Sequence, residues 1–350
     1  MAMRTNIESF PKSRRTAPRA SLHLIHGTTA DAPSAAALRV IERLANHGLR
    51  PSRDPEEVRR RYEESRRPLL APLEDVDGVF QVVPKEAGVP AMHVIRPKGS
   101  AGRTTAAIVY LHGGGWTVGT FEIYEPLCRQ IANATGSVVI YVRYRLAPEH
   151  PFPAAFNDTR AALAWVHANH RWLGVDPARI GIAGDSAGGN LAAAVSMAER
   201  EERSPCPPAF QVLLYPCLDM RACMPSHKTF AEGYLLTADL YRWYRLNYVG
   251  DYPKSQRWRL SPLFAHDFSG LPPAVVLYAG FDPLRDEAAA FAGLLREAGT
   301  PVESLYFPDM IHGFMTMGGA IPAAHGAVRR VADALKRLTA PPGGESLSGE

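Results

Sequence analysis

Short, continuous apolar runs alternate with helical stretches along the chain from about residue 77 onward. The apolar runs are rich in Val, Ile, Leu, Ala and Tyr and cover residues 106–111, 138–142, 180–183, 212–215, 274–278 and 302–307. The helical stretches between and after them cover residues 122–134, 155–169, 187–202, 286–298 and 322–338. Continuous apolar runs are typical of parallel strands that are buried on both faces. The alternation therefore predicts an α/β fold, an open and mainly parallel sheet with helices on both faces.

Two other helices are predicted before the first strong strand. One covers residues 34–47, and the second begins after Asp54, which is suited to cap the N-terminus of a helix. Pro55 would occupy the first helical position, and Glu57 would complete a capping box with Asp54.

The stretch from about residue 217 to 273 breaks the alternation, because it is rich in aromatic residues and predicts one helix, at 238–248, among long loops. We interpret it, together with the N-terminal helices, as a cap over one edge of the sheet. The expected organisation is a mobile tail and cap helices in 1–75, a core in 76–216 and 266–338, a cap insertion in 217–265, and a disordered tail in 339–350.

Charge narrows the choice of partners. The chain has 350 residues and a formal net charge of +4, which is small for this length. An arginine cluster at residues 59–67 is interleaved with glutamates, so that on a helix Glu56 faces Arg60 and Glu57 faces Arg61. We interpret this cluster as a salt-bridged solvent face and expect no nucleic-acid partner.

Four cysteines show no metal-ligand spacing, so we expect reduced thiols in a cytoplasmic protein, and a Cys217–Cys223 disulfide is the alternative. The chain has no run of about twenty apolar residues, so no membrane span is predicted. The first 26 residues lack an apolar stretch of signal-peptide length. A loose tail is favoured there over a transit peptide.

The strongest chemical signal is the sequence Gly-Asp-Ser-Ala-Gly-Gly at residues 184–189, between a predicted strand and a predicted helix. This Gly-x-Ser-x-Gly pattern is a known motif in which a tight strand-to-helix turn exposes a serine hydroxyl as nucleophile. The competing interpretations are a plain glycine-rich turn and a phosphate-binding loop. Ser186 is the candidate nucleophile.

A second glycine-rich segment, His-Gly-Gly-Gly-Trp at residues 112–116, follows the predicted strand 106–111. Consecutive glycines can turn their N–H groups toward the oxyanion of a tetrahedral intermediate. We expect the N–H groups of Gly113 and Gly114 to act with that of Ala187. A flexible loop or an anion site is the alternative, although no Gly-Lys-Ser/Thr follows to bind phosphate. His112 is expected to orient the loop.

A serine nucleophile needs a base and an acid, and we expect both downstream of Ser186, at the carboxyl ends of strands. His312 follows the predicted strand 302–307 and is therefore the preferred base. The histidines that we place elsewhere, in a helix, near a helix end or in the cap stretch, are His325, His167, His170 and His266. Asp282 follows the strand 274–278 and is the preferred acid. Its rival, Asp286, is better explained as an acid in the first turn of the following helix.

These motifs resemble those of the bacterial hormone-sensitive-lipase-like carboxylesterases, a family of the α/β-hydrolase superfamily. The resemblance runs from about residue 75 to 338. One of its segments is the run Tyr-Arg-Leu-Ala-Pro-Glu-His-Pro-Phe-Pro-Ala at residues 144–154. The other segments that carry it are 112–116, 184–189, 282–287 and 312–314. It implies a mostly parallel eight-stranded sheet with a helical cap, and carboxylesterase activity on short to medium acyl chains. It further implies a small-molecule ester substrate, no cofactor or metal, a cytoplasmic location and, in many members, a homodimer.

Other functions remain open on the same residues. An amidase, a lactonase or a deacetylase would use the same Ser186, His312 and Asp282. A ligand-binding relative without catalysis is the alternative from another class, because a fold does not fix a function.

Overall fold

The computed structural model describes residues 30–45, 49–249 and 254–340. The tails expected at the two ends fall largely outside these residues. The secondary structure alternates strands and helices as the apolar pattern predicts, and one eight-stranded sheet runs through the molecule in the order β1-β2-β4-β3-β5-β6-β7-β8. The α/β fold class is therefore confirmed.

The strands from β3 onward are parallel to one another. Their bounds are β3 (Thr105–Leu111), β4 (Val138–Val142), β5 (Val175–Asp185), β6 (Gln211–Leu214), β7 (Ala274–Phe281) and β8 (Val302–Ile311). Every residue of β3, β4 and β7 is buried, because helices cover both faces of the sheet. These strands therefore appear in the sequence as unbroken apolar runs.

Two further strands, β1 (Gly78–Val82) and β2 (Met92–Arg96), form one edge of the sheet. The apolar runs did not include them. The strand β2 pairs antiparallel with both β1 and β4. None of the β1 residues is fully buried, so its sequence mixes polar and apolar residues and gives no continuous run.

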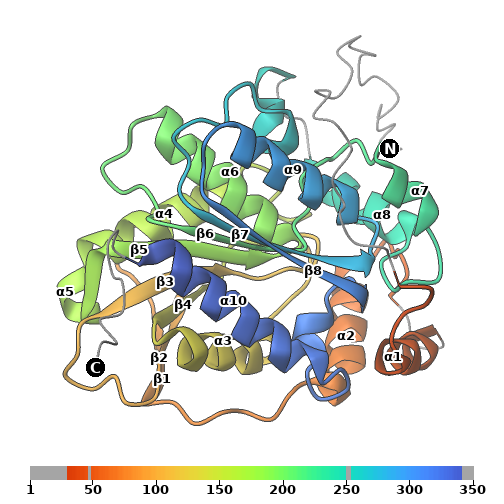
Figure 1. Cartoon of the computed structure of the whole chain (residues 1–350), viewed down its shortest axis with the longest axis horizontal. Coiled ribbons are helices and arrows are strands. Elements are labelled where there is room, and N and C mark those ends of the chain that lie inside the picture. The colour runs from red at the N-terminus through yellow and green to blue at the C-terminus, as the bar shows by residue number, and fades with distance from the viewer. Residues whose placement is uncertain (1–29, 46–48, 250–253, 341–350) are drawn as a thin grey trace, which may run out of the picture.

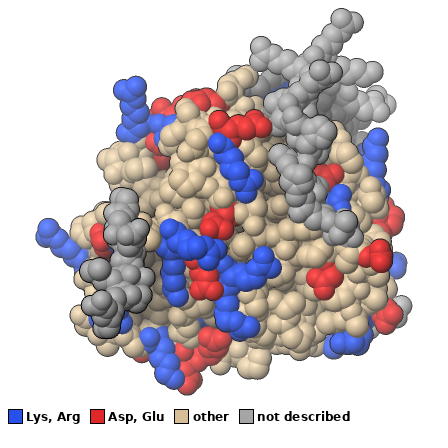
Figure 2. Space-filling view, viewed as in Figure 1, with Lys and Arg blue, Asp and Glu red and all other residues tan. Residues whose placement is uncertain are grey.

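The helices lie in two layers. Figure 1 shows α3 (Phe121–Thr135) and α10 (Ala323–Thr339) on one face of the sheet, and α4 (Ala154–Ala168), α6 (Ala187–Glu201) and α9 (Arg285–Glu297) on the other. No helix in the described part of the chain is long and apolar enough to cross a membrane. On the face drawn in Figure 2, basic and acidic side chains are interspersed.

The remaining helices gather near the carboxyl ends of β7 and β8, on the right of Figure 1. They are α1 (Ala35–Ala45), α2 (Pro55–Arg66), α7 (Pro225–Thr229) and α8 (Ala238–Val249). The short helix α5 (His170–Leu173) is not one of them and connects α4 to β5. Because ligands of open α/β sheets bind outside the carboxyl ends of the strands, these four helices are placed to border a site.

The start of α2 differs in detail from the prediction. Asp54 caps the helix by accepting a hydrogen bond from the N–H of Glu56, at 3.0 Å. Glu57 does not complete a capping box, because its carboxylate accepts a hydrogen bond from the Ser52 hydroxyl (2.6 Å) and pairs with Arg61.

The arginine cluster of α2 is only partly a solvent face. Glu57 pairs with Arg61 as predicted, at 2.5 Å. Glu56 instead pairs with Arg59, whose side chain is 18% exposed and also binds Glu149. The Arg59 guanidinium donates to the carbonyl oxygens of Thr117 (2.9 Å) and Ala147 (3.0 Å). It therefore joins α2 to two loops that follow β3 and β4.

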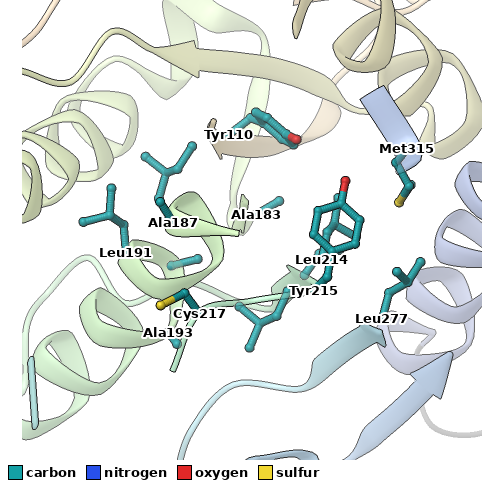
Figure 3. Packing of buried hydrophobic residues seen from close by; sticks show 14 of the residues in the cluster. Tyr110, Ala183, Ala187, Leu191, Ala193, Leu214, Tyr215, Cys217, Leu277 and Met315 are labelled. Atoms are coloured by element: carbon teal, nitrogen blue, oxygen red, sulfur yellow. The ribbon is translucent and has the colours of Figure 1, made fainter. Parts of the chain in front are cut away.

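A layer of buried side chains packs between α6 and the neighbouring strands (Figure 3). Tyr110 of β3 and Tyr215, just after β6, are also fully buried, but the ring of Tyr110 faces Tyr124 of α3 (centroids 6.4 Å apart) and that of Tyr215 faces His312 (5.1 Å). Leu191 of α6 and Leu277 of β7 belong to the same cluster. This packing fixes α6, and with it the turn that precedes α6, against the centre of the sheet.

Replacing Arg59 tests this account of α2. Arg59→Ala removes donors from the carbonyl groups of Thr117 and Ala147, so we expect the free energy of unfolding to fall by about 1–3 kcal/mol. The matched control is Arg60→Ala, because the Arg60 side chain is 69% exposed and its one ion pair among the described residues is with Glu64. That control should change stability by about 0.5 kcal/mol at most. Equal urea-unfolding midpoints for the two variants would contradict this role of Arg59.

Candidate active site

The turn between β5 and α6 holds Ser186 in a strained conformation. Its backbone has φ 52° and ψ −114°, values that residues other than glycine rarely adopt. The Ser186 N–H donates to the carbonyl oxygen of Leu214 at 2.9 Å, which ties the turn to the end of β6. This sharp turn places the hydroxyl in the cavity described below.

Glycines on both sides of Ser186 let neighbouring backbones approach closely. A Cβ on Gly188 would lie 1.9 Å from the carbonyl oxygen of Leu111, at the end of β3. A Cβ on Gly184 would lie 2.4 Å from backbone atoms of Gly188. Both contacts are with backbone, which cannot move aside as a side chain can. The motif therefore requires glycine two residues before and two residues after the serine.

The structure brings together the three residues that the sequence proposed as a triad. His312 Nε2 lies 2.9 Å from Ser186 Oγ, and His312 Nδ1 lies 2.8 Å from Asp282 Oδ2. Asp282 follows β7 and is fully buried, and its second oxygen accepts a hydrogen bond from the N–H of Leu284 at 2.8 Å. A carboxylate that accepts from Nδ1–H leaves Nε2 free to accept the serine proton.

The rival residues lie elsewhere. Asp286 is in the first turn of α9, where it pairs with Arg285 (2.9 Å) and accepts a hydrogen bond from the N–H of Ser226 (2.8 Å). His325 lies in α10 and contacts the carbonyl oxygen of Gly318. Asp286 therefore holds the start of α9 against α7.

His112 is buried against the loop that it begins. Its Nδ1 donates to the carbonyl oxygen of Gly113 at 2.7 Å, and its ring stacks on that of Tyr144 with centroids 4.3 Å apart. Burial lowers the pKa of His112 to about 4, so the ring is neutral at ordinary pH. These contacts match the orienting role expected from the sequence.

The glycine loop after β3 differs from the prediction in one residue. The N–H of Gly113 donates to Asp185 Oδ1 at 2.8 Å and is not free to bind an oxyanion, so the prediction for Gly113 was wrong. Gly114, Gly115 and Ala187 line the cavity beside Ser186. No described residue accepts a hydrogen bond from the N–H of Gly114 or Gly115, and Ala187 begins α6, where the first N–H groups have no partner within the helix.

Asp185 couples this loop to the nucleophile turn. It is buried beside Ser186, and the hydroxyl of Tyr110 donates to the same oxygen that binds Gly113, at 3.0 Å. Burial raises the pKa of the Asp185 carboxyl to about 6. The carboxylate thus fixes the first peptide of the glycine loop, and with it the direction in which the next two N–H groups point.

A cavity of about 520 Å³ opens above Ser186. Its walls are mainly apolar and come from α1, α2, α8 and the turn before α8; examples are Leu44, Tyr62, Leu236, Leu240 and Tyr244. The sequence placed the aromatic stretch near the site but did not identify these side chains. A repeat of apolar residues at a spacing of four, Val58 and Tyr62, was the available signal in α2.

Comparison with known proteins agrees with this geometry. Residues 108–316 match the family model of the α/β-hydrolase fold. The chain is an α/β-hydrolase of the hormone-sensitive-lipase-like family. It is 33% identical over 287 residues to ethyl acetate hydrolase of Pseudomonas putida, covering 81% of this chain and 90% of that protein. The carboxylic ester hydrolase LipN of Mycobacterium tuberculosis is 41% identical, over 71% of this chain and 67% of LipN.

A solved structure extends the likeness over more of the chain. A hyperthermophilic esterase from the archaeon Pyrobaculum calidifontis superposes with a TM-score of 0.80 at 36% identity, covering 88% of this chain and 99% of that one. The likeness in fold therefore covers more of the chain than residues 108–316, which match the family model.

The buried Asp185 predicts how the stability of this α/β-hydrolase depends on pH. Its pKa is raised in the folded chain from an ordinary value of 3.8 to about 6, so the folded state holds the proton more tightly than the unfolded state. This contribution to stability is present below about pH 4 and is lost as pH rises through about 6.

Asp185→Asn keeps an acceptor for the Gly113 N–H but cannot titrate. We expect the free energy of unfolding of this variant, relative to the unchanged protein, to rise by up to about 3 kcal/mol between about pH 4 and pH 7. Urea unfolding at several pH values measures the difference. A difference that stays constant over this range would show that Asp185 is not the titrating group.

Proposed function

We propose that the chain is a carboxylesterase that hydrolyses short- to medium-chain acyl esters through Ser186, His312 and Asp282. The observation that carries this proposal is the unbroken set of contacts from Asp282 through His312 to Ser186, at 2.8 and 2.9 Å. Relatives that match most of the chain are an ester hydrolase, an ethyl acetate hydrolase and an esterase.

In the first half of the reaction, Ser186 Oγ attacks the ester carbonyl and passes its proton to His312 Nε2. The new imidazolium is stabilised by the buried Asp282 carboxylate. When the carbon–oxygen bond to the alcohol breaks, His312 returns this proton to the departing alkoxide. The products of this half are a free alcohol and an acyl group bound to Ser186.

In the second half, water takes the place of the alcohol. His312 accepts a proton from the water as its oxygen attacks the acyl carbon, and returns the proton to Ser186 Oγ when the acyl bond breaks. The products are a carboxylic acid and the original enzyme, so no step requires a cofactor or a metal.

The negative charge that develops on the carbonyl oxygen in each half needs N–H donors. We assign these donors to Gly114, Gly115 and Ala187, which line the cavity beside Ser186. One such donor contributes about 3–4 kcal/mol to transition-state stabilisation in comparable enzymes. Asp185, which holds Gly113, acts on this reaction only by positioning the loop.

The expected acyl length follows from the walls of the cavity. We propose that the described parts of residues 30–75 and 217–265 act together as a cap that closes the space above Ser186, since α1, α2 and α8 all contribute to its lining. A volume of about 520 Å³ suits a small ester, including its alcohol group. A cytoplasmic location and a homodimer are proposed from the family resemblance.

A series of p-nitrophenyl esters from acetate to palmitate tests the function. We expect kcat/KM to peak at short or medium acyl chains, with an initial burst of p-nitrophenol because the acyl-enzyme accumulates. Ser186→Ala should abolish the burst and turnover. A peak at palmitate would contradict the chain-length proposal, and full turnover by Ser186→Ala would refute the mechanism.

The two neighbouring aspartates provide a matched pair for the same assay. Asp282→Asn removes the acceptor for His312 Nδ1–H, so kcat should fall by about 10³–10⁴-fold. Asp286→Asn alters another buried carboxyl, which contacts Arg285 and Ser226, and should change kcat much less. If the Asp286 variant lost more activity than the Asp282 variant, the assignment of the acid would be wrong.

A further inference from the structure

Arg66 is the last residue of α2, and it lines the same cavity as Ser186. It is only 8% exposed. The charge pattern of residues 59–67 predicted a salt-bridged solvent face, and for Arg66 this prediction was wrong. Its position follows Val58 and Tyr62 at a spacing of four, which is the buried face of the helix.

The Arg66 guanidinium has no carboxylate partner among the described residues. Nη1 contacts the sulfur of Met317, which is a weak acceptor, and Nε is buried without a hydrogen-bond partner. The guanidinium carbon also lies 5.4 Å from the centre of the Tyr62 ring. Two nearby arginines show the contrast, because Arg61 of α2 pairs with Glu57 and Arg67, just after α2, pairs with Glu63.

Burying an arginine without an opposite charge is costly, and arginines are almost never buried unless paired. The carbonyl groups at the end of α2 offer partial negative charge to a cation there. However, no carbonyl oxygen of a described residue accepts a hydrogen bond from Arg66. The guanidinium therefore keeps donors for a ligand in the cavity.

The other charged side chains around the cavity do not serve as this partner. One oxygen of Asp185 accepts hydrogen bonds from Gly113 and Tyr110. Its other oxygen accepts one from the hydroxyl of Tyr124, which is in turn hydrogen-bonded to the hydroxyl of Tyr62. The cavity is also lined by two exposed acids, Glu232 and Asp239, and by one further arginine, Arg50. None of these acids lies within 4.0 Å of the Arg66 guanidinium.

Two hydroxyl groups near Arg66 are already engaged. Ser65 Oγ donates to the carbonyl oxygen of Tyr62 at 2.9 Å, and Thr316 Oγ1 donates to that of Gly313 at 2.9 Å. Both residues line the cavity. Arg66 is therefore the group at this end of the cavity that supplies both charge and free donors.

We propose that the cavity binds esters that carry a second, anionic group, a carboxylate, which pairs with Arg66 while Ser186 attacks the ester carbonyl. This inference rests on the proposed esterase function and names its substrate class. A planar carboxylate can accept two parallel N–H bonds from a guanidinium, which gives orientation as well as binding. The apolar walls between Arg66 and Ser186 would then hold the hydrocarbon part of the substrate.

Two pairs of esters test the proposal with the charge on either side of the reacting bond. For the acyl side, the mono-p-nitrophenyl ester of adipic acid is compared with its methyl ester, which is neutral. For the alcohol side, meta-acetoxybenzoate is compared with its methyl ester. In each pair, the measured quantity is the ratio of kcat/KM for the charged ester to that for the neutral ester.

The variants are Arg66→Met and the control Arg67→Met, which removes an adjacent arginine whose side chain is 60% exposed. In at least one pair, Arg66→Met should lower the ratio by about 10- to 100-fold, because the carboxylate loses a charged partner in an enclosed site. Arg67→Met should leave the ratio within about threefold of the unchanged enzyme. A ratio that Arg66→Met leaves unchanged in both pairs overturns the proposal.

A measurement on the unchanged enzyme covers the case in which Arg66→Met does not fold. Hexanoate should inhibit hydrolysis of a neutral ester competitively, with an inhibition constant at least about tenfold lower than that of hexanamide. Equal inhibition by the acid and the amide overturns the proposal. An enzyme that hydrolyses neither neutral nor charged esters would instead refute the proposed function, so the two failures are distinguishable.

Discussion

The close approach of three backbone segments at the centre of the sheet is the constraint on which the site depends. The end of β3, the end of β5 and the first turn of α6 meet where Gly184 and Gly188 leave no room for a Cβ. This approach forces Ser186 into a positive φ and directs its hydroxyl away from the sheet. The packing of α6 on the neighbouring strands holds the strained turn in place.

A buried carboxylate carries this constraint into the neighbouring loop. Because Asp185 precedes the nucleophile and binds the N–H of Gly113, the turn and the glycine loop are set in one geometry. The histidine and the acid come from the next part of the sheet, since β7 lies beside β6 and β8 lies beside β7, and these two strands deliver Asp282 and His312 to the same edge. Parallel strands thus gather residues far apart in sequence at one place.

The sequence was sufficient for the strands of the sheet centre and for the order Ser186, Asp282, His312, because Ser186 and Asp282 each follow an unbroken apolar run and His312 follows a strand that is recognisable although its run contains polar residues. It was insufficient where a contact depends on tertiary placement. The pairing of Gly113 with Asp185 joins residues 72 positions apart, and no local pattern predicts it. The burial of Arg66 was missed because the alternating charges in α2 predicted a solvent-exposed face. The spacing of four from Val58 and Tyr62 instead places Arg66 on the buried face of the helix.

The central claim is that Ser186 forms a covalent bond to the acyl group, and intact-protein mass spectrometry with a serine-directed phosphonate tests it most directly. We expect one phosphonate per chain, located on the peptide that contains Ser186, and none on the Ser186→Ala variant. Ser196, which is buried further along α6 and donates a hydrogen bond to the carbonyl oxygen of Ala192, should remain unmodified. Labelling at another serine, or equal labelling of the variant, would contradict the account.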